Sequence, residues 1–233
     1  MSVTLNNIGI SLMSSQPSTL LTGLMGYWKL DETSGGTIDS SGNNYTGTGS
    51  SLTYNANGKI GRCYTFNGTD SRVTFGNVIK PTTALSISLW MKDGGQTAEK
   101  NIINTSVYDG VWRGWRFTRY SDQAAGVLLS SGTNNLDVAF GTTLSNDNWY
   151  HIVFTWNGTT AYVYINNVRN SGWSWSYTIS YATTHNLTFG ANQSGGQVYD
   201  GELDEIGVWN RALTSNEVSI LYNSGSGLTH PFS

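Results

Sequence analysis

Two groups of aromatic residues among polar neighbours are the residues of this sequence best suited to hold a ligand. Residues 173–177 alternate aromatic and serine side chains, so a strand here would direct three rings to one side. The second group, Tyr108, Trp112 and Trp115, lies among glycines and charged residues. Aromatic faces stack on sugar C–H faces while polar neighbours bind the hydroxyls. The alternative is that the rings pack in the core. The predicted ligand-binding residues are Trp112, Trp115, Trp173, Trp175 and Tyr177.

Oxygen-bearing side chains indicate a second kind of site. The segment 39–44 offers the carboxylate of Asp39 together with amide and backbone oxygens, and calcium takes about six to eight such ligands in a flexible loop. Asp204 lies in an expected strand, on one face with Ile206 and Val208, and a buried carboxylate there needs a partner. Alternatively, Asp39 forms an Asx turn and Asp204 binds backbone N–H groups.

Composition limits the class of protein. Charged residues make up 12% of the 233 residues and the net charge is −3, without a Lys/Arg cluster longer than a pair. A phosphate backbone requires a concentrated basic patch, so nucleic acid is not expected as a partner. No run approaches the roughly 18–20 apolar residues of a membrane-spanning helix, so no membrane partner is expected. The single cysteine, Cys63, excludes an internal disulfide and is expected to be buried.

The pattern along the chain predicts mostly strands. In residues 85–92, Leu85, Ile87, Leu89 and Met91 alternate with other residues, the period of a strand with one face on a core. Residues 214–217 match a helix capping box. The fold class expected is all-β, a two-sheet antiparallel sandwich with one short C-terminal helix. Strand-like runs occur at 26–30, 62–66, 72–75, 85–92, 101–106, 114–120, 126–131, 136–140, 149–156, 160–166, 186–190 and 201–209.

The first 24 residues differ from the rest, because they carry no charge and few turn signals. We expect residues 1–24 to form an N-terminal arm or attachment segment and residues 25–233 to form the domain. No basic region precedes a long apolar run, so the arm is not expected to be a secretory signal. Its apolar residues suit pairing with the sheet edge of another copy or of a larger particle. The alternative is that it folds back on its own domain.

An ordered series of short motifs resembles the laminin-G-like, concanavalin-A-like lectin-glucanase jelly-roll family. The series covers about residues 25–225, and its pieces are residues 26–32, 39–43, 58–61, 66–68, 86–90, 149–153, 164–166, 201–205 and 210–213. The resemblance implies a jelly roll of one concave and one convex antiparallel sheet. Members include glycan-binding modules, adhesion domains and domains attached to glycan-cleaving enzymes, so the fold is better identified than the function.

The resemblance also bears on metal and catalysis. Several members bind a structural calcium between the equivalents of the 39–44 loop and the late acidic strand, which implies Asp39, Asp204 and, as a carbonyl ligand, Asn44. Glucanases of this fold carry Glu-x-Asp-x-x-Glu on one strand. Here Glu202 and Asp204 match, but Gly207 replaces the third carboxylate, and Glu205 should point to the opposite face. We therefore expect no catalysis.

These observations favour a non-catalytic glycan-binding or adhesion module displayed on a surface, with a polysaccharide or cell-surface sugar as its partner. The first alternative is a structural or decoration protein of a virion, in a phage capsid or tail, attached through the arm. A glycan-cleaving enzyme is the least favoured alternative. The glycan-binding hypothesis and the virion alternative both imply an extracellular or virion-surface location.

Overall fold

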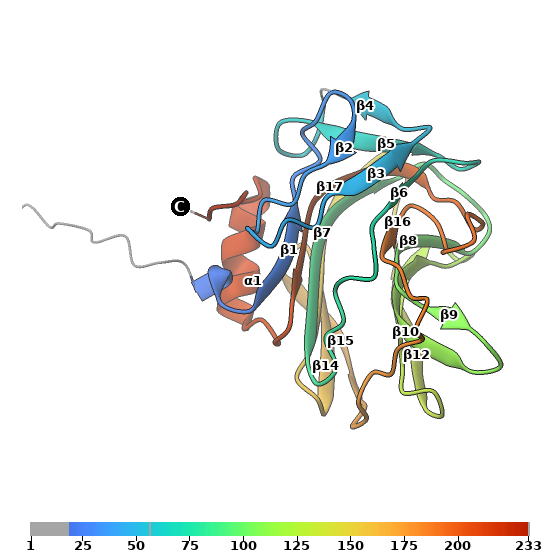
Figure 1. The fold of residues 1–233 in the computed structure, drawn as a ribbon. Helices are drawn as coiled ribbons and strands as arrows, with labels where there is room; N and C mark the ends of the chain where they lie inside the picture. The colour runs from blue at the N-terminus through green and yellow to red at the C-terminus, as the bar shows by residue number, and fades with distance from the viewer. Residues whose placement is uncertain (1–18, 56, 233) are drawn as a thin grey trace, which may run out of the picture.

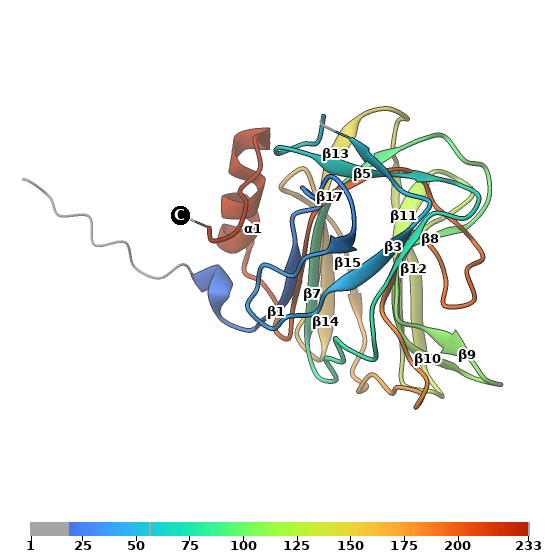
Figure 2. The same cartoon turned by 45° about the horizontal axis from the view of Figure 1, so that its top comes forward.

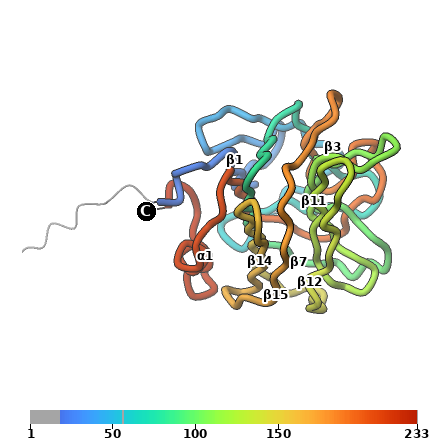
Figure 3. The backbone as a smooth tube through the Cα atoms, turned by 90° about the horizontal axis from the view of Figure 1, so that it is seen from below, coloured from blue at the N-terminus to red at the C-terminus, as the bar shows by residue number. Residues whose placement is uncertain are grey.

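Two antiparallel sheets packed face to face form the body of the protein (Figures 1 and 3). The computed structural model describes residues 19–55 and 57–232. Every one of the twelve predicted runs overlaps an observed strand. The predicted all-β sandwich with a short C-terminal helix is therefore confirmed.

The first sheet contains eight strands within the described residues. Seven of them lie side by side in the order β15–β14–β13–β7–β17–β5–β4, and β1 pairs with the second half of β17. Their bounds are β1 Leu24–Trp28, β4 Thr53–Asn55, β5 Cys63–Asn67, β7 Leu85–Asp93, β13 Trp149–Trp156, β14 Thr160–Ile165, β15 Val168–Ser174 and β17 Asp200–Trp209.

The second sheet contains nine strands within the described residues. The order is β12–β11–β10–β8–β16–β6–β3–β2, and β9 pairs with the start of β10. Their bounds are β2 Gly36–Thr37, β3 Gly47–Ser50, β6 Arg72–Thr74, β8 Lys100–Asn104, β9 Val107–Tyr108, β10 Trp112–Arg119, β11 Ala124–Ser130, β12 Asn135–Thr143 and β16 Thr188–Phe189.

The main core lies between the two sheets. Leu85, Ile87, Leu89 and Met91 of β7 all belong to it, as their alternation predicts. The intervening side chains of β7 are buried as well, because the C-terminal segment covers the outer face of the first sheet. Trp90, for example, stacks on Tyr222 with ring centroids 5.9 Å apart. The Cys63 thiol is buried, as expected, and this burial raises its pKa to about 12.

The covering segment contains the predicted helix, α1 Ser215–Tyr222, which packs beside β1 and β17 (Figures 1 and 2). The capping box is present, since the Thr214 hydroxyl accepts a bond from Glu217 N and the Glu217 side chain accepts one from Thr214 N. Asn223 in a left-handed conformation ends the helix, and the short 3-10 turn η2 Asn223–Gly225 follows.

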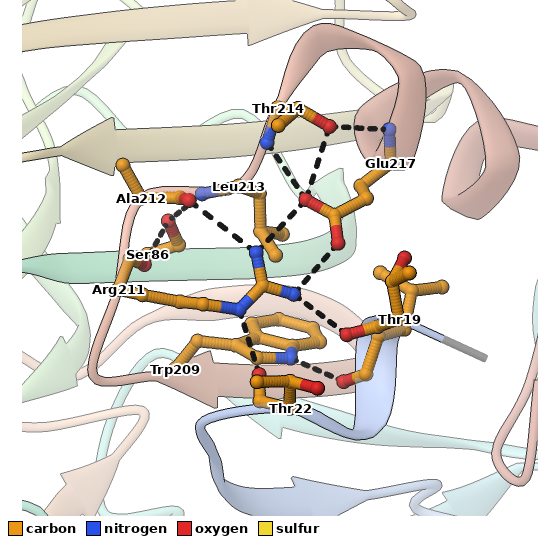
Figure 4. A network of polar contacts seen from close by, with 10 residues as sticks. Thr19, Thr22, Ser86, Trp209, Arg211, Ala212, Leu213, Thr214 and Glu217 are labelled. Atoms are coloured by element: carbon orange, nitrogen blue, oxygen red, sulfur yellow. Dashed lines mark hydrogen bonds and ion pairs between the residues drawn. The ribbon is translucent and has the colours of Figure 1, made fainter. Parts of the chain in front are cut away.

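Residues 19–24 pack against this segment and belong to the domain. The turn η1 Thr19–Leu21 places Leu20 in the cluster around α1, and Trp209 Nε1 donates to Leu20 O at 2.7 Å. Arg211 donates to Thr22 O at 2.7 Å and to Thr19 O at 2.8 Å (Figure 4). The predicted boundary after residue 24 is therefore corrected. The rest of the predicted arm, residues 1–18, lies outside the described residues.

None of the helices in the described part of the chain has the length and apolar character to cross a membrane.

Candidate functional site

A cavity of about 280 Å³ opens on the outer face of the second sheet. Because Trp115 and Phe117 of β10 point into the core, their neighbour Arg116 faces outward into the cavity. The remaining wall comes from β8, β9 and the loop between β16 and β17. The lining residues are Asn101, Asn104, Ser106, Val107, Tyr108, Trp112, Arg116, Asn192, Gln193, Ser194 and Gln197.

Two aromatic rings form one side of the cavity. Tyr108 and Trp112 are cross-strand partners in the β9–β10 hairpin, and their ring centroids are 5.2 Å apart with a tilt of 58°. The hairpin projects from the sheet in Figures 1 and 2, and the Tyr108 side chain is 65% exposed. Gly110, at a φ of 101°, lets the chain reverse between the two rings. The hairpin thus places the exposed Tyr108 ring and the half-buried Trp112 ring beside a polar cavity.

Arg116 forms part of the cavity floor. Its guanidinium carbon lies 4.6 Å from the Trp112 ring centroid. Its Nη2 contacts Glu99 Oε1 at 3.1 Å and Asp137 Oδ2 at 3.7 Å, and its side chain is only 7% exposed. Asp137 also accepts a hydrogen bond from Tyr120, whose pKa is raised chiefly by burial. The positive charge is therefore balanced by two carboxylates.

Amide side chains also line the cavity. Asn101 Nδ2 donates to Gln197 Oε1 at 2.8 Å, and Gln193 Nε2 donates to Thr105 O at 3.1 Å. Asn104 Oδ1 accepts bonds from both the backbone N and the hydroxyl of Ser106. These bonds hold the amides in place before any ligand arrives. A pocket of fixed amides beside two rings can bind a neutral ligand rich in hydroxyls.

Burial removes two of the predicted ligand-binding residues from any such role. Trp115 is fully buried between the sheets, and Trp175 packs on Trp156 with ring centroids 4.9 Å apart. Trp175 lies beyond the end of β15, where its backbone N bonds to Thr159 O, so the predicted three-ring alternation is interrupted. Neither ring has a face available for a sugar, and both predictions are corrected.

The other three predicted residues do not form one site. Trp112 lines the cavity, whereas Trp173 and Tyr177 do not. Trp173 is partly buried against Phe140, with ring centroids 6.0 Å apart. Tyr177 is 48% exposed and follows β15. Their roles in binding stay predictions, of which only that of Trp112 is supported by a cavity.

The residues predicted for calcium do not fit a calcium cage. Asp39 Oδ1 accepts bonds from Tyr27 N at 3.0 Å and Ser41 N at 2.9 Å, and Oδ2 accepts one from Tyr45 N at 3.1 Å. Backbone donors thus take three of the roughly four acceptor positions of this carboxylate. Asn44 is exposed and donates to Gly42 O. In residues 19–55 and 57–232, no group of three acidic, His or Cys side chains could hold a metal ion.

Asp204 is buried and separate from that loop's hydrogen bonds. Its Oδ2 accepts a bond from Ile60 N at 2.8 Å, and its Oδ1 has no partner among the described residues. Burial raises the pKa of Asp204 to about 9. The carboxylates of Asp39 and Asp204 thus both accept backbone N–H bonds, as the alternative to a calcium site predicts. Calcium binding stays a prediction.

Two carboxylates of the acidic strand are each held by another side chain. Glu202 contacts Lys92 Nζ at 2.6 Å, and Glu205 accepts a bond from the Tyr27 hydroxyl. A bulge between Asp204 and Gly207, with Glu205 at a φ of 50°, shifts the alternation. Ile206 and Val208 therefore face the core with Leu203 instead of sharing a face with Asp204, and Glu205 lies outside the core on the Asp204 side. The expected faces of Asp204 and Glu205 are corrected.

Comparison with known proteins gives the family of this chain. The family model described as the concanavalin A-like lectin/glucanases superfamily, Laminin_G_3, matches residues 67–219. The chain belongs to this superfamily. No curated protein matches it.

Solved structures with the superfamily fold include toxin binding domains and a domain of a glycan-cleaving enzyme. The binding domain of Paraclostridial Mosquitocidal Protein 1 has a TM-score of 0.73 and 18% identity, over 88% of this chain and 53% of that one. A botulinum neurotoxin type C structure, described as depending on two ganglioside molecules for cell entry, has a TM-score of 0.69 and 14% identity, over 88% and 52%. This chain thus spans about half the length of these toxin domains.

Domain 4 of AbnA, a GH43 extracellular arabinanase from Geobacillus stearothermophilus solved with arabinotriose, has a TM-score of 0.66 and 21% identity. The alignment covers 88% of this chain and 98% of that domain. At these identities the likeness establishes the fold alone.

In this superfamily member, most of the pocket was not foreseen from the sequence. Arg116 and Asn101 lie within predicted strands, and nothing in the strand pattern distinguishes them. Gln193 and Gln197 come from the run 192–197, which is rich in amides, Ser and Gly. That polar run between two strands was the one available signal for a binding loop.

Proposed function

We propose that the protein is a non-catalytic glycan-binding module whose site is the cavity beside Tyr108 and Trp112. The observation that carries the proposal is that the exposed Tyr108 ring and the half-buried Trp112 ring line the same cavity as fixed amide side chains. A sugar presents an apolar C–H face and a rim of hydroxyls. The rings suit the first and the amides suit the second.

The lining chemistry supports binding without catalysis. None of the cavity residues in the described part of the chain is Asp or Glu, whereas glycoside hydrolysis uses a pair of carboxyl groups. Glu99 and Asp137 lie next to the cavity but are held by Arg116. The acidic strand β17 belongs to the other sheet, and its Glu202 is ion-paired to Lys92.

The similar structures support a sugar as the ligand class. The arabinanase domain was solved with arabinotriose, a neutral oligosaccharide, and the neurotoxin depends on gangliosides, which are acidic glycolipids. Both are glycans, although their charges differ. A glycan bound at one end of the domain also suits an adhesion role, with residues 1–18 providing attachment to a surface or particle.

A glycan array tests the proposal. The full-length protein should bind a restricted set of glycans, and Trp112→Ala should lose those signals while retaining its melting temperature. Arg169→Ala, a change on the exposed edge strand β15, serves as the control and should bind as wild type does. Absence of glycan binding by the folded wild-type protein, or full binding by Trp112→Ala, would reject the proposal.

A further inference from the structure

We propose that Gln197 and Asn192 make the cavity select glycans that carry an N-acetyl group. The inference rests on the proposed function and specifies its ligand class. Both residues line the cavity, together with Tyr108 and Trp112. Gln197 is exposed and Asn192 is half-buried, so both are accessible from the solvent that fills the cavity before a ligand binds.

Neighbouring residues fix the Gln197 side chain at the cavity wall. Its Oε1 accepts hydrogen bonds from Asn101 Nδ2 at 2.8 Å and from Asn192 Nδ2 at 3.4 Å, and both of these residues also line the cavity. The backbone O of Gln197 accepts a bond from Asn101 N at 2.9 Å. Its left-handed φ of 50° is a conformation that a non-glycine residue keeps only where its surroundings hold it. The amide of Gln197 therefore has a set orientation before a ligand binds.

The amide oxygens of the two side chains are used within the protein, whereas some of their N–H groups are free. Gln197 Oε1 has two donors. Asn192 Oδ1 accepts bonds from the backbone N and hydroxyl of Ser194 and from Gly196 N. Gln197 Nε2 has no partner among the described residues, and Asn192 Nδ2 donates only to Gln197. The two side chains can therefore offer a ligand only hydrogen-bond donors.

Two neighbouring donors suit a carbonyl oxygen. Because Asn192 Nδ2 bonds to Gln197 Oε1, the two amide groups lie side by side. A carbonyl oxygen has two lone pairs and can accept from both amides. A sugar hydroxyl can accept as well, but its own hydrogen finds no free acceptor on either amide. The N-acetyl group is the common sugar substituent that supplies a neutral carbonyl.

The aromatic rings of the cavity suit the rest of the N-acetyl group. Its methyl is apolar, and ligand pockets combine apolar surface with a few placed polar groups. Tyr108, which is 65% exposed, and Trp112 provide that surface in the same cavity. The volume of about 280 Å³ lies just below the roughly 300–1,000 Å³ of pockets for drug-sized ligands. It is suited to one sugar with its substituent.

The charges beside the cavity favour a neutral carbonyl over a carboxylate. Arg116 is the charged residue among the lining residues of the described chain. Its Nη2 contacts Glu99 Oε1 at 3.1 Å and Asp137 Oδ2 at 3.7 Å. A sugar carboxylate would therefore meet two carboxylates of the protein and no unbalanced positive charge. A neutral acceptor avoids this repulsion.

Titration calorimetry of the full chain with two matched pairs of probes tests the inference. The pairs are tri-N-acetylchitotriose with cellotriose, and N-acetylgalactosamine with galactose. Within each pair, acetamido groups replace hydroxyls at C2 and nothing else differs. We expect the acetamido probe of at least one pair to bind about tenfold or more tightly than its hydroxyl counterpart. This ratio corresponds to about two hydrogen bonds, each contributing roughly three- to tenfold.

Gln197→Glu separates a donor role from a structural one. The variant has nearly the same shape and keeps an oxygen for the bonds from Asn101 and Asn192, but it replaces the free donor with an acceptor. It should weaken the acetamido probe about tenfold and leave the hydroxyl probe within about twofold, because a hydroxyl can donate to the new carboxylate. The matched control is Gln123→Glu, the same change at another left-handed glutamine that does not line the cavity. It should bind both probes as wild type does.

Asn192→Asp tests the second donor and keeps the inference testable if Gln197→Glu lowers the melting temperature. It retains the oxygen that accepts from Ser194 and Gly196 and removes the N–H groups. We expect it to weaken the acetamido probe about three- to tenfold.

Each failure has its own signature. The inference is wrong, while the glycan-binding function stands, if hydroxyl probes bind as tightly as acetamido probes. The same holds if neither acetamido probe binds although other glycans bind on the array, or if both variants bind every probe as wild type does. If no glycan binds the folded wild-type protein, the proposed function itself fails and this inference fails with it.

Discussion

Two other side chains contact the Trp112 ring. The centroid of the Tyr108 ring lies 5.2 Å from that of Trp112, and the guanidinium carbon of Arg116 lies 4.6 Å from it. Such cation–π contacts contribute about 0.5–1 kcal/mol at exposed sites. A ring ordered before binding loses little conformational entropy when a ligand stacks on it. Pre-organisation of this kind suits weak ligands such as sugars.

His151 should make stability depend on pH. It is buried against both Trp90 and Tyr222, with Nε2 3.0 Å from Ser88 Oγ. Burial, with a smaller contribution from Lys59, lowers its pKa to about 3. In the unfolded chain it binds a proton near pH 6.5, so unfolding takes up one proton between about pH 6.5 and pH 3. This residue therefore contributes a loss of stability as the pH falls through that range, and nothing above it.

The measurement is urea unfolding of wild type and His151→Gln at several pH values from 7.5 to 4. Relative to the variant, wild type should lose about 1.4 kcal/mol per pH unit below about pH 6. If the free energy of unfolding changed equally with pH in wild type and variant, the folded protein would bind a proton at His151 as readily as the unfolded chain does.

Asp39→Ala should destabilise the fold whether or not calcium is present. The carboxylate accepts three backbone N–H bonds that join β1 to the following loop, and the change leaves those donors without partners. We expect a loss of about 3 kcal/mol, against about 1 kcal/mol for the exposed Asp122→Ala, which removes the acceptor of a single backbone N–H bond. Melting curves of wild type in calcium and in chelator test the calcium prediction in the same experiment. A lower melting temperature in chelator would show that calcium binds and stabilises the fold in addition to these hydrogen bonds.

At the scale of elements, the N-terminal turn η1 is part of the fold. A chain that begins at Gly26 loses Leu20 from the outer cluster and deprives Trp209 and Arg211 of their backbone acceptors. It should be less stable by about 3–5 kcal/mol, from one buried leucine and one or two unmade hydrogen bonds.

A chain that begins at Thr19 keeps all of these contacts and should melt as the full-length protein does. It also separates folding from attachment, because any assembly or anchoring lost with residues 1–18 alone belongs to that segment. A Gly26 chain as stable as the Thr19 chain would show that the η1 contacts contribute nothing.

A strand could be predicted from the alternation of its residues wherever one of its faces lies on the core. The long strand β7 was found on this basis, and the capping box found α1. Alternation also separates Trp112 from Trp115, because residues three apart on a strand point to opposite faces. One of the two had to be buried, and grouping them as one cluster overlooked this.

Other elements gave no such signal. Strands β2 and β3 consist of Gly, Thr and Ser, and β15 is an exposed edge strand, so none of the three shows an alternation of apolar and polar residues. The left-handed Glu205 shifts the face of every later residue of β17, and a non-glycine residue in that conformation cannot be anticipated from pattern. The pocket combines residues from strands and a loop far apart in sequence, so their meeting needed the fold.

At the scale of the molecule, the two outer faces have different uses. The outer face of the first sheet is covered by α1, η1 and the C-terminal segment, while that of the second sheet holds the cavity. In Figure 1, α1 and η1 lie on one side of the sandwich and β9 on the other. A partner bound near Thr19 would therefore leave the Tyr108–Trp112 site free. This arrangement suits a domain that is attached on one side and binds a glycan on the other.

Two exposed tyrosines, one from each predicted aromatic group, allow the most direct test of the site. Titration calorimetry of the best glycan from the array should compare wild type, Tyr108→Ala and Tyr177→Ala. Each variant removes one exposed ring, and only Tyr108 lines the cavity. We predict that Tyr108→Ala weakens the affinity about tenfold, as expected for an aromatic contact residue, and that Tyr177→Ala binds as wild type does. Unchanged affinity in Tyr108→Ala with a loss in Tyr177→Ala would contradict the assignment and move the site to the segment after β15.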